Sequence, residues 1–210
     1  MIAVIFLIAM FSSILLSLMG ALPFWASGAI VLTSLAGLCF SAVLDQQLRR
    51  KIRRRSRQLQ ARWGMRTTHL GGLPVPLDTP AVLFLLHDHL RLETEFDYWK
   101  IPLSELKKIL IVSSENIRRL PDRQLGELLA TGNIRSFSSL REKIRHHDKA
   151  VRGHGILMIA YKTEKNDPRL LILATLLRPA TLNGYFAAGG LPADIFSRFE
   201  ANGKPVRPVV

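Results

Sequence analysis

The chain has 210 residues and a formal net charge of +13 at pH 7, from 29 Lys and Arg against 16 Asp and Glu. Its single cysteine, Cys39, excludes an intrachain disulfide and a cysteine-based zinc site. The net charge is +8 in residues 45–66 and +5 in residues 67–210. Because this basicity lies beside an apolar segment, it favours anionic lipid headgroups over nucleic acid, and we expect no nucleic-acid partner.

Residues 1–44 contain no charged side chain and no His. A hydrocarbon core of about 30 Å needs roughly 20 helical residues, so this segment is long enough for two crossings. The break falls at Gly20-Ala21-Leu22-Pro23, because Pro suits the first turn of a new helix. The sequence therefore predicts a transmembrane helical hairpin, with spans at Ile2–Met19 and Pro23–Leu44.

The arginine-dense segment after Leu44 sets the expected orientation. Basic residues near the end of a span stay in the cytoplasm. We therefore expect an integral protein of the plasma (inner) membrane, with both termini and the soluble domain in the cytoplasm.

Two alternatives to the hairpin fit the pattern less well. A cleaved signal peptide would need a basic n-region and a small-x-small cleavage site. Met1 to Met19 lacks a basic n-region, and no such cleavage site follows before a second full-length span. In a soluble domain, a buried hairpin would need two helices that are apolar on every face, whereas the helices of such domains usually have one polar face.

Small side chains recur every four residues in the second predicted span, at Ala29, Thr33, Gly37 and Ser41. Such a stripe lets another helix approach closely. It predicts helix packing within the hairpin, and self-association into a homo-oligomer is the competing use.

A basic juxtamembrane helix is predicted over residues 45–68. Leu48, Ile52, Leu59 and Trp63 follow Leu44 at helical spacing, with basic residues on the other sides. Such a helix can lie in the interface, with its cations on anionic lipid headgroups. The alternative is an orientation signal with no further role. The residues predicted to contact headgroups are Arg49, Arg50, Lys51, Arg53, Arg54, Arg55 and Arg57.

The cytoplasmic domain is predicted over residues 69–200, and Gly64 and the Gly71-Gly72 pair mark its boundary. Ala81–Leu86 and Leu90–Glu93 read as a hairpin around the turn His87-Asp88-His89. A third strand follows at residues 96–103, then a short helical turn from Ser104 and an extended stretch at residues 109–112.

The second half of this domain begins with a polar, partly helical insertion at residues 121–152. Gly155–Lys162 and residues 170–177 then predict a hairpin of central strands, because both runs are almost continuously apolar. Pro192-Ala193-Asp194 signals a final helix through Phe199, and residues 201–210 form a tail.

This order resembles the bacterial pleckstrin-homology-like (PH-like) domains of small membrane proteins. The resemblance rests on Gly72-Leu73-Pro74, on the strand and turn Leu83 to Leu92, and on Trp99 to Ile109, which looks like the family's strand and "I-P-L-x-x-I/L" bend. It implies an α+β protein, with an antiparallel β barrel or sandwich closed by a C-terminal helix. It implies a binding or scaffold module with no catalytic residues.

The function classes that the sequence leaves open are three. The first is a non-enzymatic, membrane-anchored module that binds a protein partner or anionic headgroups, without cofactor or metal. The second is an accessory subunit of a larger membrane complex. The third is a metal-dependent hydrolase built on His87, Asp88 and His89, although a metal site needs three or four ligands held together.

Overall fold

The structure is a computed structural model that describes residues 2–21, 23–114, 116, 155–163, 167–192, 194–199 and 205–206. The predicted insertion at residues 121–152 falls entirely outside these residues, as does most of the predicted tail. The chain divides into two compact units, Met1–Arg54 and Arg55–Val210. Each unit is described by itself.

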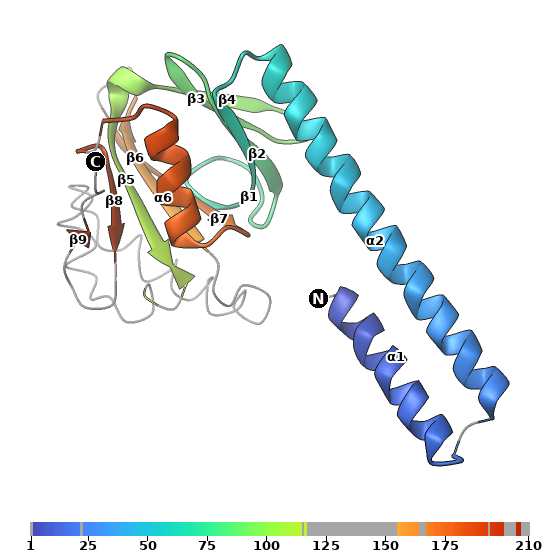
Figure 1. Cartoon of the computed structure of the whole chain (residues 1–210). Helices are drawn as coiled ribbons and strands as arrows, with labels where there is room; N and C mark the ends of the chain where they lie inside the picture. The colour runs from blue at the N-terminus through green and yellow to red at the C-terminus, as the bar shows by residue number, and fades with distance from the viewer. Residues whose placement is uncertain are drawn as a thin grey trace. The chain divides into compact units, whose positions relative to one another are not determined.

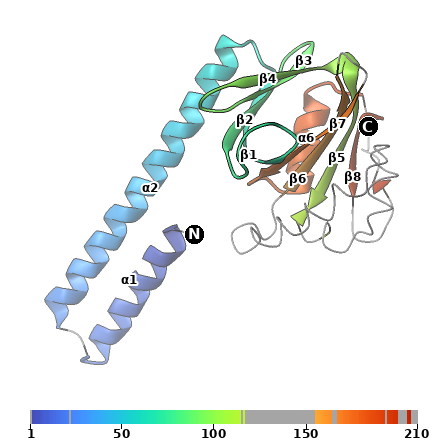
Figure 2. The same cartoon turned by 180° about the vertical axis from the view of Figure 1, so that it is seen from behind.

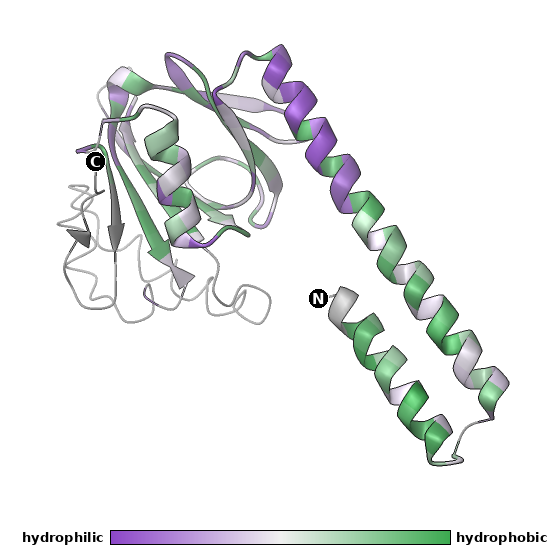
Figure 3. Ribbon diagram, in the orientation of Figure 1, coloured by the Kyte–Doolittle hydropathy of each residue, from purple (hydrophilic) through white to green (hydrophobic). Residues whose placement is uncertain are grey.

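The first unit consists of helix α1 (Ile2–Leu18) and most of helix α2 (Phe24–Gln58). Gly20 turns the chain between them with a left-handed φ of 72°. The two predicted helices are therefore confirmed. Of the described helices, only α2 is both long and apolar enough to cross a membrane, while α1 is apolar but shorter. Figure 3 shows α2 hydrophobic over its first part and hydrophilic toward its end.

Small side chains of α2 pack against α1, but not along the stripe predicted from the sequence. Ser27 and Ser34 are buried, and a Cβ on Gly37 would collide with the Phe6 ring of α1. The Ser27 hydroxyl donates a hydrogen bond of 3.3 Å to the Ser13 carbonyl oxygen.

Two of the four predicted stripe residues, Gly37 and Ser41, lie at or beside this face, whereas Ala29 and Thr33 are exposed. The reason is periodicity. Ser27, Ser34 and Ser41 are seven residues apart, which keeps them on one face of two nearly antiparallel helices, whereas a strict spacing of four drifts around the helix.

Within the described residues, the second unit contains one sheet of nine strands and a helix (Figure 1). The strand order is β4-β3-β2-β1-β7-β6-β5-β8-β9, and neighbours are antiparallel except β5 and β8. The strands are β1 (Trp63–Gly71), β2 (Pro80–Leu85), β3 (His89–Glu93), β4 (Tyr98–Pro102), β5 (Leu106–Ser113), β6 (Gly155–Lys162), β7 (Pro168–Thr175), β8 (Phe196–Phe199) and β9 (Pro205–Val206).

The sheet must curl back on itself. Strands β4 and β5 are six places apart in the sheet, a distance of about 29 Å at the usual spacing between strands. Only the short 3-10 helix η1 (Leu103–Glu105) joins them, and three residues reach about 10 Å. A flat sheet is therefore impossible, and the views in Figure 1 and Figure 2 show the strands wrapped around a common interior.

The interior of the curled sheet is the main hydrophobic core. Leu83, Leu92, Ile109 and Leu173, from four different strands, are each at most 1% exposed within it. A second buried cluster lies on the other face of β5, β6 and β7 and includes Leu110, Met158 and Ile172. Successive residues of β6 point to opposite faces, and both faces are buried. This explains the near-continuous apolar sequence of the strand.

Both predicted hairpins are confirmed. Strands β2 and β3 pair in antiparallel register around residues 86–88, and β6 pairs with β7 from Gly155↔Thr175 to Lys162↔Pro168. The predicted third strand corresponds to β4. The predicted helical turn from Ser104 is the shorter η1, after which β5 already begins at Leu106.

The prediction of a basic helix over residues 45–68 is wrong at its end. Helix α2 stops at Gln58, and Gln60 has a left-handed φ of 52°. Trp63, expected on an interfacial helix, begins β1 and is 8% exposed. Its ring packs edge-on against Phe186, with centroids 5.1 Å apart. Burying an indole in the core outweighs the helical spacing that the sequence displays.

The predicted C-terminal helix at residues 192–199 is also wrong. Residues 196–199 form β8, which pairs in parallel with β5, and the Ile109 amide donates a 2.6 Å hydrogen bond to the Ile195 carbonyl. The edge of β5 needs backbone partners, and this need prevails over the weak helix signal at Pro192.

The helix that packs on the core is instead α6 (Pro179–Ala188), directly after β7. Pro179 occupies its first turn, while Leu182 and Phe186, four residues apart, are fully buried. The Arg62 guanidinium donates a hydrogen bond to the Gly189 carbonyl oxygen, where a cation complements the helix C-terminus.

Two neighbouring glycines provide a matched test of the curled sheet. Gly72 has φ 101°, and a Cβ there would meet the backbone of Leu170 and Leu171, whereas a Cβ on Gly71 has only the Ile172 side chain at 4.0 Å. We expect Gly72→Ala to lower the free energy of unfolding by about 2 kcal/mol or more, and Gly71→Ala by less than about 1 kcal/mol. Thermal unfolding of the two full-length variants checks this, and equal losses would contradict the geometry.

Candidate functional site

Four of the seven predicted headgroup residues share one face of α2. Arg50, Arg53, Arg54 and Arg57 stand at positions i, i+3, i+4 and i+7, which stack on one side of a helix, and all four are exposed. No ion pair joins any of them to another described residue. We call these four side chains the basic face of α2.

The other three predicted cations differ from this set. Arg49 donates a 2.8 Å hydrogen bond to Asp45 one turn earlier. Lys51 and Arg55 lie away from the basic face, one helical turn from each other. Arg55 is engaged with the sheet, so its predicted role on headgroups is not supported.

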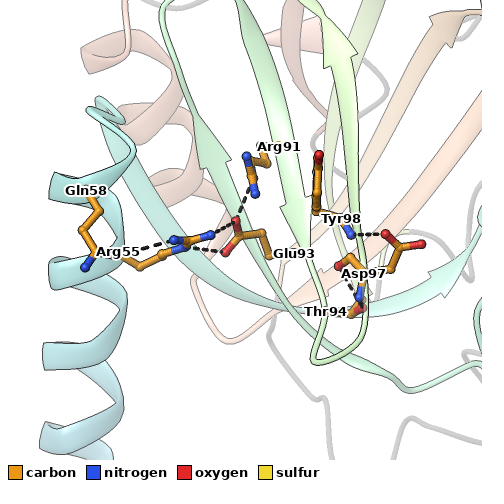
Figure 4. A network of polar contacts seen from close by, with 7 residues as sticks. All are labelled: Arg55, Gln58, Arg91, Glu93, Thr94, Asp97 and Tyr98. Atoms are coloured by element: carbon orange, nitrogen blue, oxygen red, sulfur yellow. Dashed lines mark hydrogen bonds and ion pairs between the residues drawn. The ribbon is translucent and has the colours of Figure 1, made fainter.

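Arg55, in the last turn of α2, binds Glu93 at the end of β3 with two hydrogen bonds (Figure 4). Its Nε and Nη2 atoms lie 3.0 and 2.9 Å from the two carboxylate oxygens. Bidentate geometry of this kind orients both side chains. A single guanidinium thus ties the last turn of α2 to β3.

A second arginine completes the network on the outer face of β3 and β4. The Arg91 Nε lies 2.7 Å from Glu93 Oε1 as an ion pair, without the alignment of a hydrogen bond. The Arg91 guanidinium also stacks on Tyr98, 4.0 Å from the ring centroid. Glu93 therefore lies between two cations.

These cations determine the ionisation of Glu93. Its partial burial would raise the pKa of the carboxyl, but the hydrogen bonds of Arg55 and the positive charges of Arg55 and Arg91 outweigh burial and hold the pKa below its ordinary value. Glu93 is therefore a carboxylate at neutral pH.

The His87-Asp88-His89 turn does not assemble a metal site. The His89 Nδ1 lies 2.6 Å from an Asp88 carboxylate oxygen, and this hydrogen bond lowers the Asp88 pKa. No group of three His, Cys, Asp or Glu side chains that could hold a metal is present among the described residues. The hydrolase hypothesis therefore lacks a third ligand in this part of the chain.

His69 is buried in β1 and holds the β1–β2 connection. The Leu73 amide donates a 3.2 Å hydrogen bond to His69 Nε2, so Nε2 is the acceptor. The other ring nitrogen, Nδ1, lies 3.3 Å from the Pro76 carbonyl oxygen, to which it donates in this tautomer. No sequence pattern predicts this role, because a lone His has no recognisable spacing.

The β3–β4 turn is held by its own side chains. The Thr94 amide and hydroxyl both donate hydrogen bonds to the Asp97 carbonyl oxygen, and the Asp97 amide donates one back to the Thr94 hydroxyl. The Asp97 carboxylate accepts a hydrogen bond of 2.7 Å from the Tyr98 amide. Phe96 at the tip is 89% exposed. The turn therefore presents an aromatic ring to solvent on a rigid backbone.

Comparison with known proteins returns no relative. No family model, no curated protein and no solved structure matches the chain. The functional interpretation therefore rests on the geometry of this chain.

The Arg55–Glu93 pair makes a pH-dependent prediction. A carboxyl with a lowered pKa in the folded state stabilises the fold above its unfolded pKa, and this contribution is lost as the pH falls through the folded pKa. In Arg55→Gln we expect the Glu93 pKa to rise and the free energy of unfolding at pH 7 to fall by about 0.5 to 1 kcal/mol. This loss is small because Arg55 is about half exposed, so solvent screens the ion pair.

The measurement is an NMR titration of the Glu93 carboxyl, together with thermal unfolding at neutral and acidic pH. Arg57→Gln is the matched control, since Arg57 lies in the same last turn of α2 and pairs with no described carboxylate. An unchanged Glu93 pKa in Arg55→Gln, or an equal change in both variants, would refute the pairing.

Proposed function

We propose that this chain is a membrane-anchored, non-enzymatic binding module. In this proposal α1 and α2 form a two-span hairpin in the inner membrane, and both termini and the sheet domain are cytoplasmic. The basic face of α2 contacts anionic headgroups, and the sheet domain engages a protein partner.

The observation that carries the proposal is the continuity of α2. Its uncharged part, Phe24 to Leu44, is 21 residues long and would extend about 31 Å, which matches a hydrocarbon core. The helix then continues without a break into the basic face. The first cation of the basic face, Arg50, stands about 9 Å along the helix beyond Leu44. Its long side chain reaches back toward the lipid phosphates, where each cation contributes on the order of 1 kcal/mol on an anionic leaflet.

The exposed surface of the first unit also supports a lipid environment. Ile5, Phe11, Leu32 and Phe40 are each between 58% and 68% exposed within the unit. Apolar side chains on this scale favour lipid or another apolar surface over water. Helix α1, with 17 residues, lies at the short end of the range for a crossing helix.

A PH-like identity of the sheet domain is supported by its topology. Seven antiparallel strands curl in the order β4-β3-β2-β1-β7-β6-β5, and a helix that follows β7 packs on the core. Such a scaffold presents loops at its ends. The resemblance to PH-like domains implies no catalytic residues, which favours a binding role.

An accessory subunit of a larger membrane complex is the second candidate. Ala29 and Thr33 belong to the small-residue stripe and stay uncovered in the hairpin. They leave room for a further helix, either from another protein or from a second copy of this chain.

Headgroup contact is tested with spin-labelled lipids around the full-length protein reconstituted in bilayers. The wild type is expected to immobilise labelled phosphatidylglycerol several-fold better than labelled phosphatidylcholine, and high salt should weaken this preference. The fourfold variant Arg50→Gln, Arg53→Gln, Arg54→Gln, Arg57→Gln should lose most of the preference.

The control removes the same number of charges elsewhere, through Arg66→Gln, Lys100→Gln, Lys107→Gln and Arg169→Gln on the strands. Equal lipid preference in the wild type and the α2 variant would exclude the basic face from headgroup binding.

A further inference from the structure

Three connections of the sheet lie at one end of the domain. Strands β1 to β4 form an antiparallel meander, so the β1–β2 and β3–β4 connections lie at the same end. Strand β7 begins beside the end of β1, as shown by the pairing Gly71↔Ile172, which adds the β6–β7 connection. The loop end is defined here as residues 72–79, 94–97, Thr163 and Asp167.

Two large apolar side chains are exposed at the loop end. Phe96 is 89% exposed and Leu77 is 44% exposed. Elsewhere among the described residues of the second unit, the large apolar side chains exposed by more than a third are Tyr98, Leu176 and Tyr185. No described residue covers the Phe96 ring, and an aromatic side chain that becomes buried is a common energetic anchor of interfaces.

Both tips are ordered before any partner arrives. In the loop that contains Leu77, the buried His69 ring bonds the Leu73 amide and the Pro76 carbonyl oxygen. In the turn that contains Phe96, the Asp97 amide donates a hydrogen bond of 3.1 Å to the Thr94 hydroxyl. A loop that is already ordered loses less conformational entropy on binding. The exposed side chains are therefore presented in a fixed backbone frame.

The charge at the loop end is opposite to that of the chain as a whole. Its described residues include four carboxylates, Asp78, Glu95, Asp97 and Asp167, and no Lys, Arg or His, and the two flanking cations, Lys162 and Arg169, still leave this set with a net negative charge. The full chain has a net charge of +13. An anionic leaflet would repel these carboxylates, so lipid is a poor occupant for this surface.

We propose that the loop end docks a protein partner that offers an apolar pocket for Phe96, rimmed by Lys or Arg side chains. The inference rests on the proposed binding role and names the chemistry of the protein partner. Opposite charges around an apolar anchor raise the association rate and fix the orientation of the complex.

Docking by strand addition at the neighbouring sheet edge is disfavoured. In an antiparallel pair, every second residue turns its backbone groups toward the partner strand and the others turn theirs away. The hydrogen bonds Thr94–Asp97 and Asp88–Leu103 fix this alternation between β3 and β4. The backbone groups that face the open edge of β4 are therefore those of Tyr98, Lys100 and Pro102. The Tyr98 amide is bound by the Asp97 carboxylate, and Pro102 has no amide hydrogen. Of these three residues, only Lys100 has an amide that could bond an added strand. We therefore expect the side chains of the loop end to contact the partner.

The test places a photocrosslinking benzophenone amino acid at position 96 of the full-length protein in its native membrane. Position 176, which follows β7 at the opposite end of that strand and is 64% exposed, is the control site. Mass spectrometry of the adduct identifies the crosslinked peptide. Glu95→Lys reverses the charge beside Phe96, and Asp88→Lys is the matched reversal in the β2–β3 connection at the other end of the meander.

We expect a protein adduct at position 96 and none at 176, with a crosslinked segment of net positive charge. Glu95→Lys should weaken the adduct about tenfold, and Asp88→Lys should leave it unchanged. A lipid adduct, no adduct, equal crosslinking at position 176, or an adduct that survives Glu95→Lys would overturn the proposal. Headgroup binding fails separately, because its test changes α2 alone.

Discussion

A charged side chain is costly in hydrocarbon, and this constraint governs how the chain can be placed. Between Leu44 and Asp45 the sequence changes from uncharged to arginine-dense, inside one uninterrupted helix. In the proposed arrangement, the lipid–water boundary therefore lies within a few residues of Leu44. Because the helix continues through this boundary, the proposed arrangement would hold the basic face of α2 on the headgroup side, with no loop between the span and the cations.

The sheet domain is organised around closure of its own hydrophobic interior. Joining β4 to β5 through three residues forces the strands to curl, and Trp63, Phe186 and Phe196 pack together where α6 covers the core. Because strand pairing and packing use the interior and much of the backbone, recognition is left to the connections and outer faces. Carboxylates and an exposed Phe gather at one end of the sheet domain, whereas arginines gather on α2. The two proposals assign the first surface to a protein partner and the second to lipid.

The sequence predicted those elements whose signals are local. Both hairpins follow from apolar runs separated by polar turns, and the two N-terminal helices follow from the absence of charge and from Pro23. The errors arose where a tertiary interaction prevailed. Trp63 shows helical spacing with Leu59 but is drawn into the core, and residues 196–199 pair with β5 because its backbone edge needs a partner. Helix α6 had a signal that was overlooked, namely Pro179 at its start and Gly189-Gly190 at its end.

The candidate site was predictable only as a group of cations. Their helical spacing separates Arg50, Arg53, Arg54 and Arg57 from the rest, and this can be read from the sequence. The pairing of Arg55 with Glu93 joins residues 38 positions apart, and the two hydrogen bonds of His69 depend on a loop that folds back on β1. Contacts of this kind depend on the fold, so local periodicity does not predict them.

Labelling of single thiols with a charged, membrane-impermeant reagent tests the central claim most directly, since Cys39 is the only cysteine in the chain. The account predicts that Cys39 stays unlabelled in intact membranes from either side and reacts only after denaturation. In a Cys39→Ser background, Gln58→Cys should be labelled from the cytoplasmic side alone. Labelling of Cys39 in intact membranes, or of position 58 from the outside, would contradict the placement of α2 in the bilayer.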